Sequence, residues 1–384
     1  MFSSLMQSPR LRAHTEDRHA TWLELFFDLV LVAAIAQVAH LLVKANTLSE
    51  GAVYAGLFLL VFWVWCGHTI YSTRFDFGDP VFKVLTFFNM FTLIIMAVEV
   101  HNVAHGHAFT FALAYLSSRL LLLCLLGRAF YHVPQVRKGL KVYIVGFGIG
   151  TLIWASSLFF HAPHIYWIWA IAIGFELLVP WYIWRKGDAD MQVSSEHIPE
   201  RFGLFTIIVL GENIFAVVNG LKDLSWNSAS VTVAVLSFVL AVAIWWSYFQ
   251  RIEQASENLR LGSGQPYIYS HFPILLGIVA VGIGALRLII ESNDDSISLA
   301  TLVILLGGYA SWWLGITLLS LITRPQSARG GQLIIGNLFK LIILALIGLY
   351  GRDQSAIEVI GAICTLALIS FVWQTREIWN YKKL

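Results

Sequence analysis

Charged residues are scarce in this chain of 384 residues, where Asp, Glu, Lys and Arg together make up 12%. Soluble domains carry about 25%, so the composition excludes an ordinary soluble protein. The three cysteines, Cys66, Cys124 and Cys364, lie in apolar segments without CxxC spacing, which excludes a disulfide framework and a cysteine zinc site. No GxSxG, Walker A or dinucleotide-binding motif stands out, and we therefore expect neither a cofactor nor a metal.

Apolar residues are abundant, and 58% of the chain is hydrophobic. A helix needs about 20 apolar residues to cross a bilayer core of roughly 30 Å. We predict an all-α polytopic membrane protein with about twelve spans, and their approximate bounds are 22–43, 52–71, 81–101, 109–126, 142–160, 166–184, 203–219, 228–250, 267–290, 298–322, 333–350 and 356–373.

Lys and Arg are distributed unevenly between the predicted loops. Of the 25 basic residues, only Lys44, Lys222 and Arg352 fall in loops on the side opposite the N-terminus. Because cytoplasmic loops retain positive charge, this pattern places both termini in the cytoplasm. The expected partners are the lipid bilayer and its anionic headgroups, and no nucleic acid is expected.

One sequence segment recurs. HATWLELFFDLVLV at 19–32 returns as HIPERFGLFTIIVL at 197–210, which aligns Asp28 with Thr206 and Leu23 with Arg201. Six spans in each half predict two parallel repeats at 21–186 and 201–374, and such repeats are typical of many transporters. A cytoplasmic linker at 187–200 is expected to join them. Residues 1–20, which lack the apolar core of a signal peptide, are expected to form a retained cytoplasmic extension, and 375–384 a cytoplasmic tail.

Three segments resemble the bacterial low temperature requirement A family: TWLELFFDLVLVAAIAQVAHLL, WCGHTIYSTRFDFGDPVFKVLTFFNM and HIPERFGLFTIIVLGENIFAVVNGL. The resemblance implies an integral protein of the bacterial inner membrane that is linked to growth at low temperature. Gln250 departs from the aspartate with which the family usually ends the WWSYFQ block. A shorter likeness is to two-repeat potassium channels with an Arg-x-x-x-Phe-Ser-Asp motif, which Arg201, Phe205 and Thr206 match in part.

Ionisable residues inside the spans are the candidates for chemistry, because a charge at the bilayer centre costs about 3 kcal/mol on insertion scales. Glu24 and Asp28 lie one helical turn apart on the first span, with Gln37 further along it. Glu212 and Asn213 lie about midway along the seventh. These five residues are the predicted transport or ion-binding site, expected between the two repeats.

Other charged residues are interpreted as supporting groups. Arg119 and Glu176 lie at compatible depths and are possible partners for each other, for Asp28 or for Glu212. Arg74, Asp76 and Asp79, with Arg201, are expected to form a cytoplasmic network, either structural or gating. Arg287 is expected to extend towards the membrane interface.

The leading hypothesis is a transporter or channel for protons, alkali cations or a small solute coupled to them. One alternative is a membrane-embedded enzyme acting on a lipid or isoprenoid. Another is a non-catalytic stress or scaffold protein whose buried charges specify helix packing. The oligomeric state is not predicted.

Overall fold

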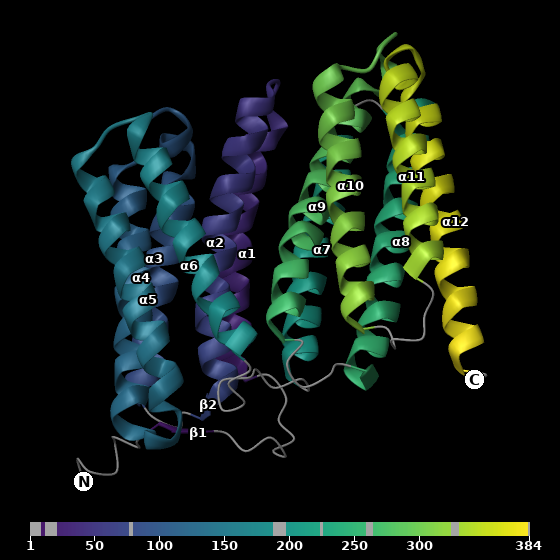
Figure 1. Cartoon of the computed structure of the whole chain (residues 1–384). Helices are drawn as coiled ribbons and strands as arrows, with labels where there is room; N and C mark the ends of the chain where they lie inside the picture. Colours follow the sequence, from purple (N-terminus) through teal and green to yellow (C-terminus); the bar gives the residue numbers. More distant parts are fainter. Residues whose placement is uncertain are drawn as a thin grey trace. The chain divides into compact units, whose positions relative to one another are not determined.

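Twelve α-helices make up most of the described part of the chain (Figure 1). The computed structural model describes residues 9–11, 21–76, 80–186, 197–222, 226–258, 264–323 and 330–382. The helices are α1 (Trp22–Val43), α2 (Leu48–Arg74), α3 (Pro80–Ala104), α4 (Phe109–His132), α5 (Arg137–Ser156), α6 (His164–Lys186), α7 (His197–Lys222), α8 (Ser228–Asn258), α9 (Gly264–Ile290), α10 (Leu299–Thr323), α11 (Gly330–Tyr350) and α12 (Ala356–Lys382).

The predicted fold class is confirmed. Among the described residues, eleven helices, all except α11, are long and apolar enough to cross a membrane. A two-residue strand pair, β1 (Arg10–Leu11) with β2 (Phe75–Asp76), was not expected and attaches part of the N-terminal segment to the end of α2. The chain is an all-α polytopic membrane protein.

Three helices begin with the same capping arrangement. The Glu24 carboxylate accepts hydrogen bonds from the backbone N–H of Thr21 at 2.8 Å and from its hydroxyl at 2.9 Å, while the Thr21 hydroxyl accepts from the Glu24 N–H. This capping box satisfies N–H groups that a helix N-terminus leaves without partners. The same arrangement starts α2, with Thr47 and Glu50, and α12, with Ser355 and Glu358.

The chain divides into two compact units. Unit 1 comprises Met1–Val38, Val53–Phe202 and Leu259–Ile268, and unit 2 comprises Ala39–Ala52, Gly203–Asn258 and Tyr269–Leu384. Within unit 1, α3, α4, α5 and α6 pack against one another in chain order. Within unit 2, α8 packs against α10 and α12. Helix α11 also contacts α10 and α12. The predicted repeat bounds describe duplication of the sequence and stay a prediction.

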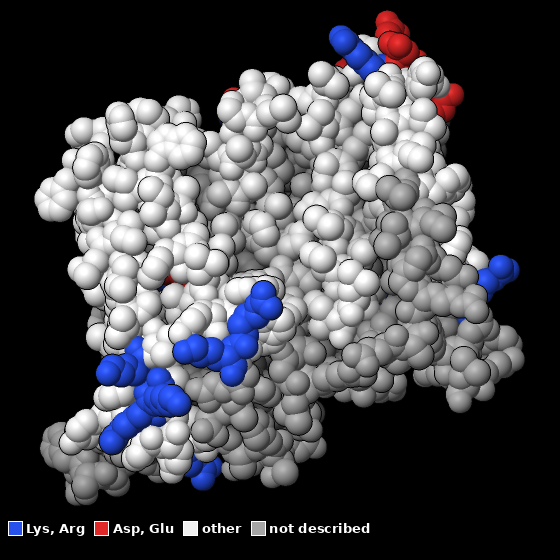
Figure 2. Space-filling view, in the orientation of Figure 1, with Lys and Arg blue, Asp and Glu red and all other residues white. Residues whose placement is uncertain are grey.

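Charged side chains are sparse on the face in Figure 2, except near its edges. In unit 1, basic residues occur where α4 and α6 end and α5 begins: Arg128, Arg137, Lys138, Lys141, Arg185 and Lys186. A weakly charged middle with basic residues at helix ends is typical of membrane-spanning bundles.

Arg287, which was expected to extend towards the membrane interface, is buried within unit 2, and the expectation stays a prediction. Its side chain is only 8% exposed. Nη1 donates to the carbonyl oxygen of Ala45, while Nε donates to the Thr301 hydroxyl at 2.9 Å. An arginine at the end of a helix can satisfy the last carbonyls, which have no partner within the helix. Because Nη1 also lies 3.4 Å from the carbonyl oxygen of Leu42, Arg287 stabilises the C-terminal end of α1 and the segment that follows it.

Glycine allows α9 and α10 to approach closely in unit 2. A Cβ on Gly284 would lie 2.7 Å from Cα of Leu305, and a Cβ on Gly308 would lie 2.8 Å from the backbone nitrogen of Val281. Gly277 and Gly315 make equally close backbone approaches, one helical heptad away on each helix. Small residues at such an interface favour association because they bring two helix backbones into van der Waals contact.

Adjacent glycines provide a test of this packing. We expect Gly308→Ala to destabilise the protein by about 1–3 kcal/mol, the usual cost of overpacking. Gly307→Ala, where a Cβ meets nothing within 4 Å, is expected to leave stability unchanged or slightly raised. Thermal unfolding of both variants in detergent measures the difference. Equal midpoints would contradict the close contact.

Candidate functional site

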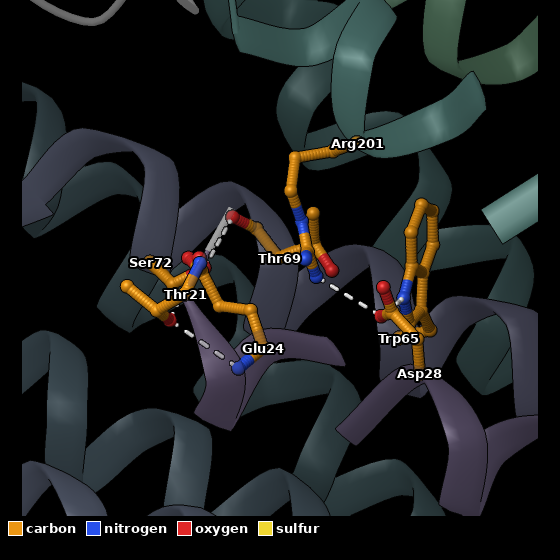
Figure 3. Close-up of polar contacts among 7 residues, drawn as sticks. All are labelled: Thr21, Glu24, Asp28, Trp65, Thr69, Ser72 and Arg201. Atoms are coloured by element: carbon orange, nitrogen blue, oxygen red, sulfur yellow. Dashed lines mark hydrogen bonds and ion pairs between the residues drawn. The ribbon is translucent and has the colours of Figure 1, made fainter. Parts of the chain in front are cut away.

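Asp28 is fully buried on α1 and is held by two donors. Its Oδ1 atom accepts a hydrogen bond from the Trp65 indole N–H at 2.7 Å and forms an ion pair with Arg201 Nη2 at 2.9 Å (Figure 3). All three residues belong to unit 1. This set, together with Thr69, is called the Asp28 site below.

Helix geometry explains how the Asp28 site is assembled. Trp65, Thr69 and Ser72 are spaced four and three residues apart, so they share one face of α2. Asp28 and Glu24 share a face of α1 by the same spacing. Arg201, near the start of α7, extends between these residues (Figure 3).

Several polar atoms of the Asp28 site are buried without a hydrogen-bond partner in the described part of the chain. They are Oδ2 of Asp28, Nε and Nη1 of Arg201, and Oγ1 of Thr69. A buried polar group without a partner costs about 1–3 kcal/mol, and more if charged. A network with buried polar atoms that lack partners therefore contributes little to the stability of the fold. Such a network indicates a place where a ligand or a proton is expected to bind.

Aromatic rings surround the Asp28 site. Phe202, next to Arg201, packs edge-on against Trp65 with ring centroids 4.7 Å apart and against Tyr267 at 5.6 Å. His68 stacks between Phe27, at 4.2 Å, and Phe82, at 5.6 Å. Apolar rings strengthen the attraction between Asp28 and Arg201 because they lower the local polarity.

Glu24 has a structural role in addition to its predicted place in a site. Its carboxylate is 7% exposed and forms the capping box of α1 with Thr21. It also interacts electrostatically with Arg201, so Arg201 lies in the field of both acids on α1.

A second buried ion pair, between Arg119 on α4 and Glu176 on α6, also lies in unit 1. It is bidentate, with Nε of Arg119 3.2 Å from Oε1 and Nη2 bonded to Oε2. Trp63 donates a further hydrogen bond to Oε2 at 2.9 Å. Gly150 provides the necessary space, because a Cβ there would collide with the Glu176 side chain. Arg119 and Glu176 therefore pair with each other, not with Asp28. Neither residue has a buried polar side-chain atom without a partner in the described structure.

The remaining predicted residues belong to different units. Gln37 is half-buried on α1 and belongs to unit 1, whereas Glu212, half-buried, and Asn213, 3% exposed, lie on α7 in unit 2. Both amide atoms of Asn213 lack partners in the described structure, and its side chain lies against Gly282. The joint site expected of these residues stays a prediction.

Only part of the expected cytoplasmic network is described. Arg74 ends α2 and lies over the Tyr143 ring, with 5.6 Å between the guanidinium carbon and the ring centroid. Asp76 is in β2, but its side chain lies outside the described residues, as does the whole of Asp79. Arg201, which was also predicted to join this network, pairs with Asp28, and the network as a whole stays a prediction.

The sequence analysis did not single out Trp65 or Thr69. Their spacing from Ser72 in WCGHTIYS is typical of residues that share one face of a helix.

The sequence analysis also missed a chain of neutral, buried hydrogen-bonding side chains in unit 2. The Thr206 hydroxyl donates to the Tyr248 hydroxyl at 2.9 Å, and the Tyr248 oxygen lies 3.0 Å from Nε2 of His271. Within the described residues, no group of three or more His, Cys, Asp or Glu is arranged to hold a metal ion.

Fold and site together define a polytopic all-α membrane protein with buried ion pairs in its spans. The model of the bacterial low temperature requirement A protein family matches residues 19–371, and the chain belongs to that family. It is also similar to an uncharacterized protein of Rhizobium meliloti (strain 1021), with 26% identity over 293 residues, covering 71% of this chain and 70% of that protein. No solved structure matches.

The pair of Arg119 and Glu176 is testable as a structural element. Removing one buried partner strands the other charge, so we expect Glu176→Leu or Arg119→Met alone to cost about 3–5 kcal/mol of stability. The double variant Arg119→Met with Glu176→Leu is expected to lose much less than the sum. A double-mutant cycle by thermal unfolding in detergent measures this coupling, and additive losses would refute a coupled pair.

Proposed function

We propose that this protein moves protons across the membrane, alone or coupled to a solute, and that Asp28 is the carboxylate that binds and releases the proton. The observation that carries the proposal is the uneven bonding of Asp28: both donors contact Oδ1, while the buried Oδ2 has no partner in the described structure. A proton on Oδ2 would not displace either donor.

Comparison of the two buried ion pairs supports this assignment. The pair of Arg119 and Glu176 is bidentate and has no buried polar side-chain atom without a partner in the described structure, as expected of a pair that specifies packing. Asp28 and Arg201 share one bond and leave three of their own polar atoms without partners. A pair that contributes less to stability than its burial costs is the better candidate for function.

A proton is favoured over an alkali cation at Asp28. The Arg201 guanidinium already lies 2.9 Å from Oδ1, and a metal cation on the same carboxylate would be repelled by it. A proton instead bonds to the carboxylate and removes its negative charge. Arg201 then loses its ionic partner, which weakens the link between α1 and α7 and permits their rearrangement.

Glu212 and Asn213 form the proposed second polar group on the proton path. Glu212 is a half-buried carboxylate within a membrane span, and the neighbouring Asn213 amide is buried without a partner in the described residues. Carboxylates at membrane depth are typical of proton relays.

The uneven distribution of Lys and Arg further supports an inner-membrane protein with cytoplasmic termini.

Proton flux into proteoliposomes tests the proposal. The full-length protein is reconstituted with an internal pH-sensitive dye, and membrane potentials of either sign are imposed with and without gradients of Na⁺ or K⁺. Because Asn cannot take up the proton, we expect Asp28→Asn to reduce flux by about 10²-fold or more, as for other groups that transfer protons. Asp353→Asn, the same substitution at an exposed position, is expected to retain flux.

A charge-neutral double variant separates function from stability. Asp28→Asn with Arg201→Gln removes both charges, so we expect near-native thermal stability without proton flux. Retained flux in a stably folded Asp28→Asn protein would remove Asp28 from the mechanism. Absence of flux from the native protein under every gradient would reject proton transport.

A further inference from the structure

A cavity of about 260 Å³ lies in unit 2, lined by residues of α8, α10, α11 and α12. These four helices appear on the right of Figure 1. The cavity is independent of the Asp28 site, because every residue that lines it belongs to unit 2.

Two basic side chains, Arg251 and Lys340, line this cavity, and no acidic side chain does so among the described residues. Arg251 is 6% exposed, near the end of the span Ser228–Ile252. Lys340 is half-buried on α11, with Nζ 4.6 Å from the centroid of the Trp313 ring. The lining of the cavity therefore includes two cationic side chains.

Trp312 adds a hydrogen-bond donor to the same wall. It is 3% exposed and lines the cavity, and its indole N–H has no hydrogen-bond partner in the described structure. An indole nitrogen can only donate, so its partner must be an acceptor such as an anionic oxygen. Two cations and a buried donor match the oxygen atoms of a phosphate group.

Exposed apolar residues accompany these polar groups. Phe339, Ile369 and Trp373 line the cavity and are 62%, 54% and 52% exposed. In a membrane-spanning bundle, exposed apolar side chains face the lipid phase. The cavity thus combines an inner anion-binding region with an apolar border, a combination suited to an amphiphile.

We propose that this cavity binds the phosphate of an anionic phospholipid, with Arg251, Lys340 and the Trp312 N–H as its ligands and the acyl chains along Phe339, Ile369 and Trp373. A cavity of this volume accommodates a headgroup phosphate and leaves the chains outside. A phospholipid with an additional ammonium group binds less well, because that group would approach two cations.

Lipid titration of the delipidated full-length protein, followed by native mass spectrometry, tests the proposal. Phosphatidylglycerol, phosphatidylethanolamine and inorganic phosphate are added separately and in competition. We expect phosphatidylglycerol to bind most tightly and inorganic phosphate at equal concentration not to displace it. Lys340→Gln is expected to weaken phosphatidylglycerol binding about tenfold, the loss of one charge-assisted contact, with recovery in Lys340→Arg.

Two further variants keep the test decisive. Arg352→Gln removes an exposed charge from unit 2 outside the cavity, and we expect it to bind phosphatidylglycerol as the native protein does. Trp312→Phe keeps an aromatic ring without its N–H and is expected to weaken binding about threefold, the loss of one neutral hydrogen bond. Since Lys340 is half-buried, its variant carries the test even if replacement of the buried Arg251 unfolds the protein.

Three results would overturn the proposal. The first is equal phosphatidylglycerol affinity in Lys340→Gln and Arg352→Gln. The second is equally tight binding of phosphatidylethanolamine, which would assign the cavity to phospholipids in general. The third is displacement of the lipid by inorganic phosphate, which would identify a site for a free anion.

Discussion

The contact between Asp28 and Arg201 is the constraint on which the arrangement of unit 1 depends. In a site lined by Trp65 and Phe202, neither charge is tolerable alone, because each has lost its water and the apolar rings provide no compensation. The pair therefore requires α1, α2 and α7 to meet at one place. Trp65 completes this requirement through its hydrogen bond to the same Asp28 oxygen that Arg201 contacts.

The two copies of the repeated segment contribute unequally to this contact. Asp28 comes from the first copy and aligns with Thr206 in the second, whereas Arg201 comes from the second copy and aligns with Leu23 in the first. Each copy thus provides the charge that the other lacks. Thr206 instead begins a neutral chain through Tyr248 to His271. Divergence after duplication would produce one ionic site and one neutral site in this way.

Much of the fold could be predicted from the sequence, because apolar length and the positions of charges are local properties. The predicted span 22–43 coincides with α1. The predicted span 52–71 is shorter than α2, Leu48–Arg74, because polar residues at both ends of this helix interrupt the apolar run. A Thr-x-x-Glu or Ser-x-x-Glu pattern would have located three helix starts.

The candidate site was less predictable because it depends on which helices meet. The position of Arg119 along its span was compatible with several acidic partners. The structure shows that α4 brings Arg119 to Glu176 on α6. The bond between Arg201 and Asp28 was not predicted, because it depends on how the start of α7 packs against α1. Trp65 was missed because a tryptophan in an apolar span resembles ordinary packing until its N–H is seen to bond Asp28.

The glycine contact between α9 and α10 has a mechanical consequence. Where Gly284 and Gly308 bring backbone against backbone, no flexible side chain lies between the helices to absorb a rotation or a sliding displacement. The two helices must move as one stiff body at this contact. Any conformational change of unit 2 is therefore expected to carry α9 and α10 together and to bend the chain elsewhere.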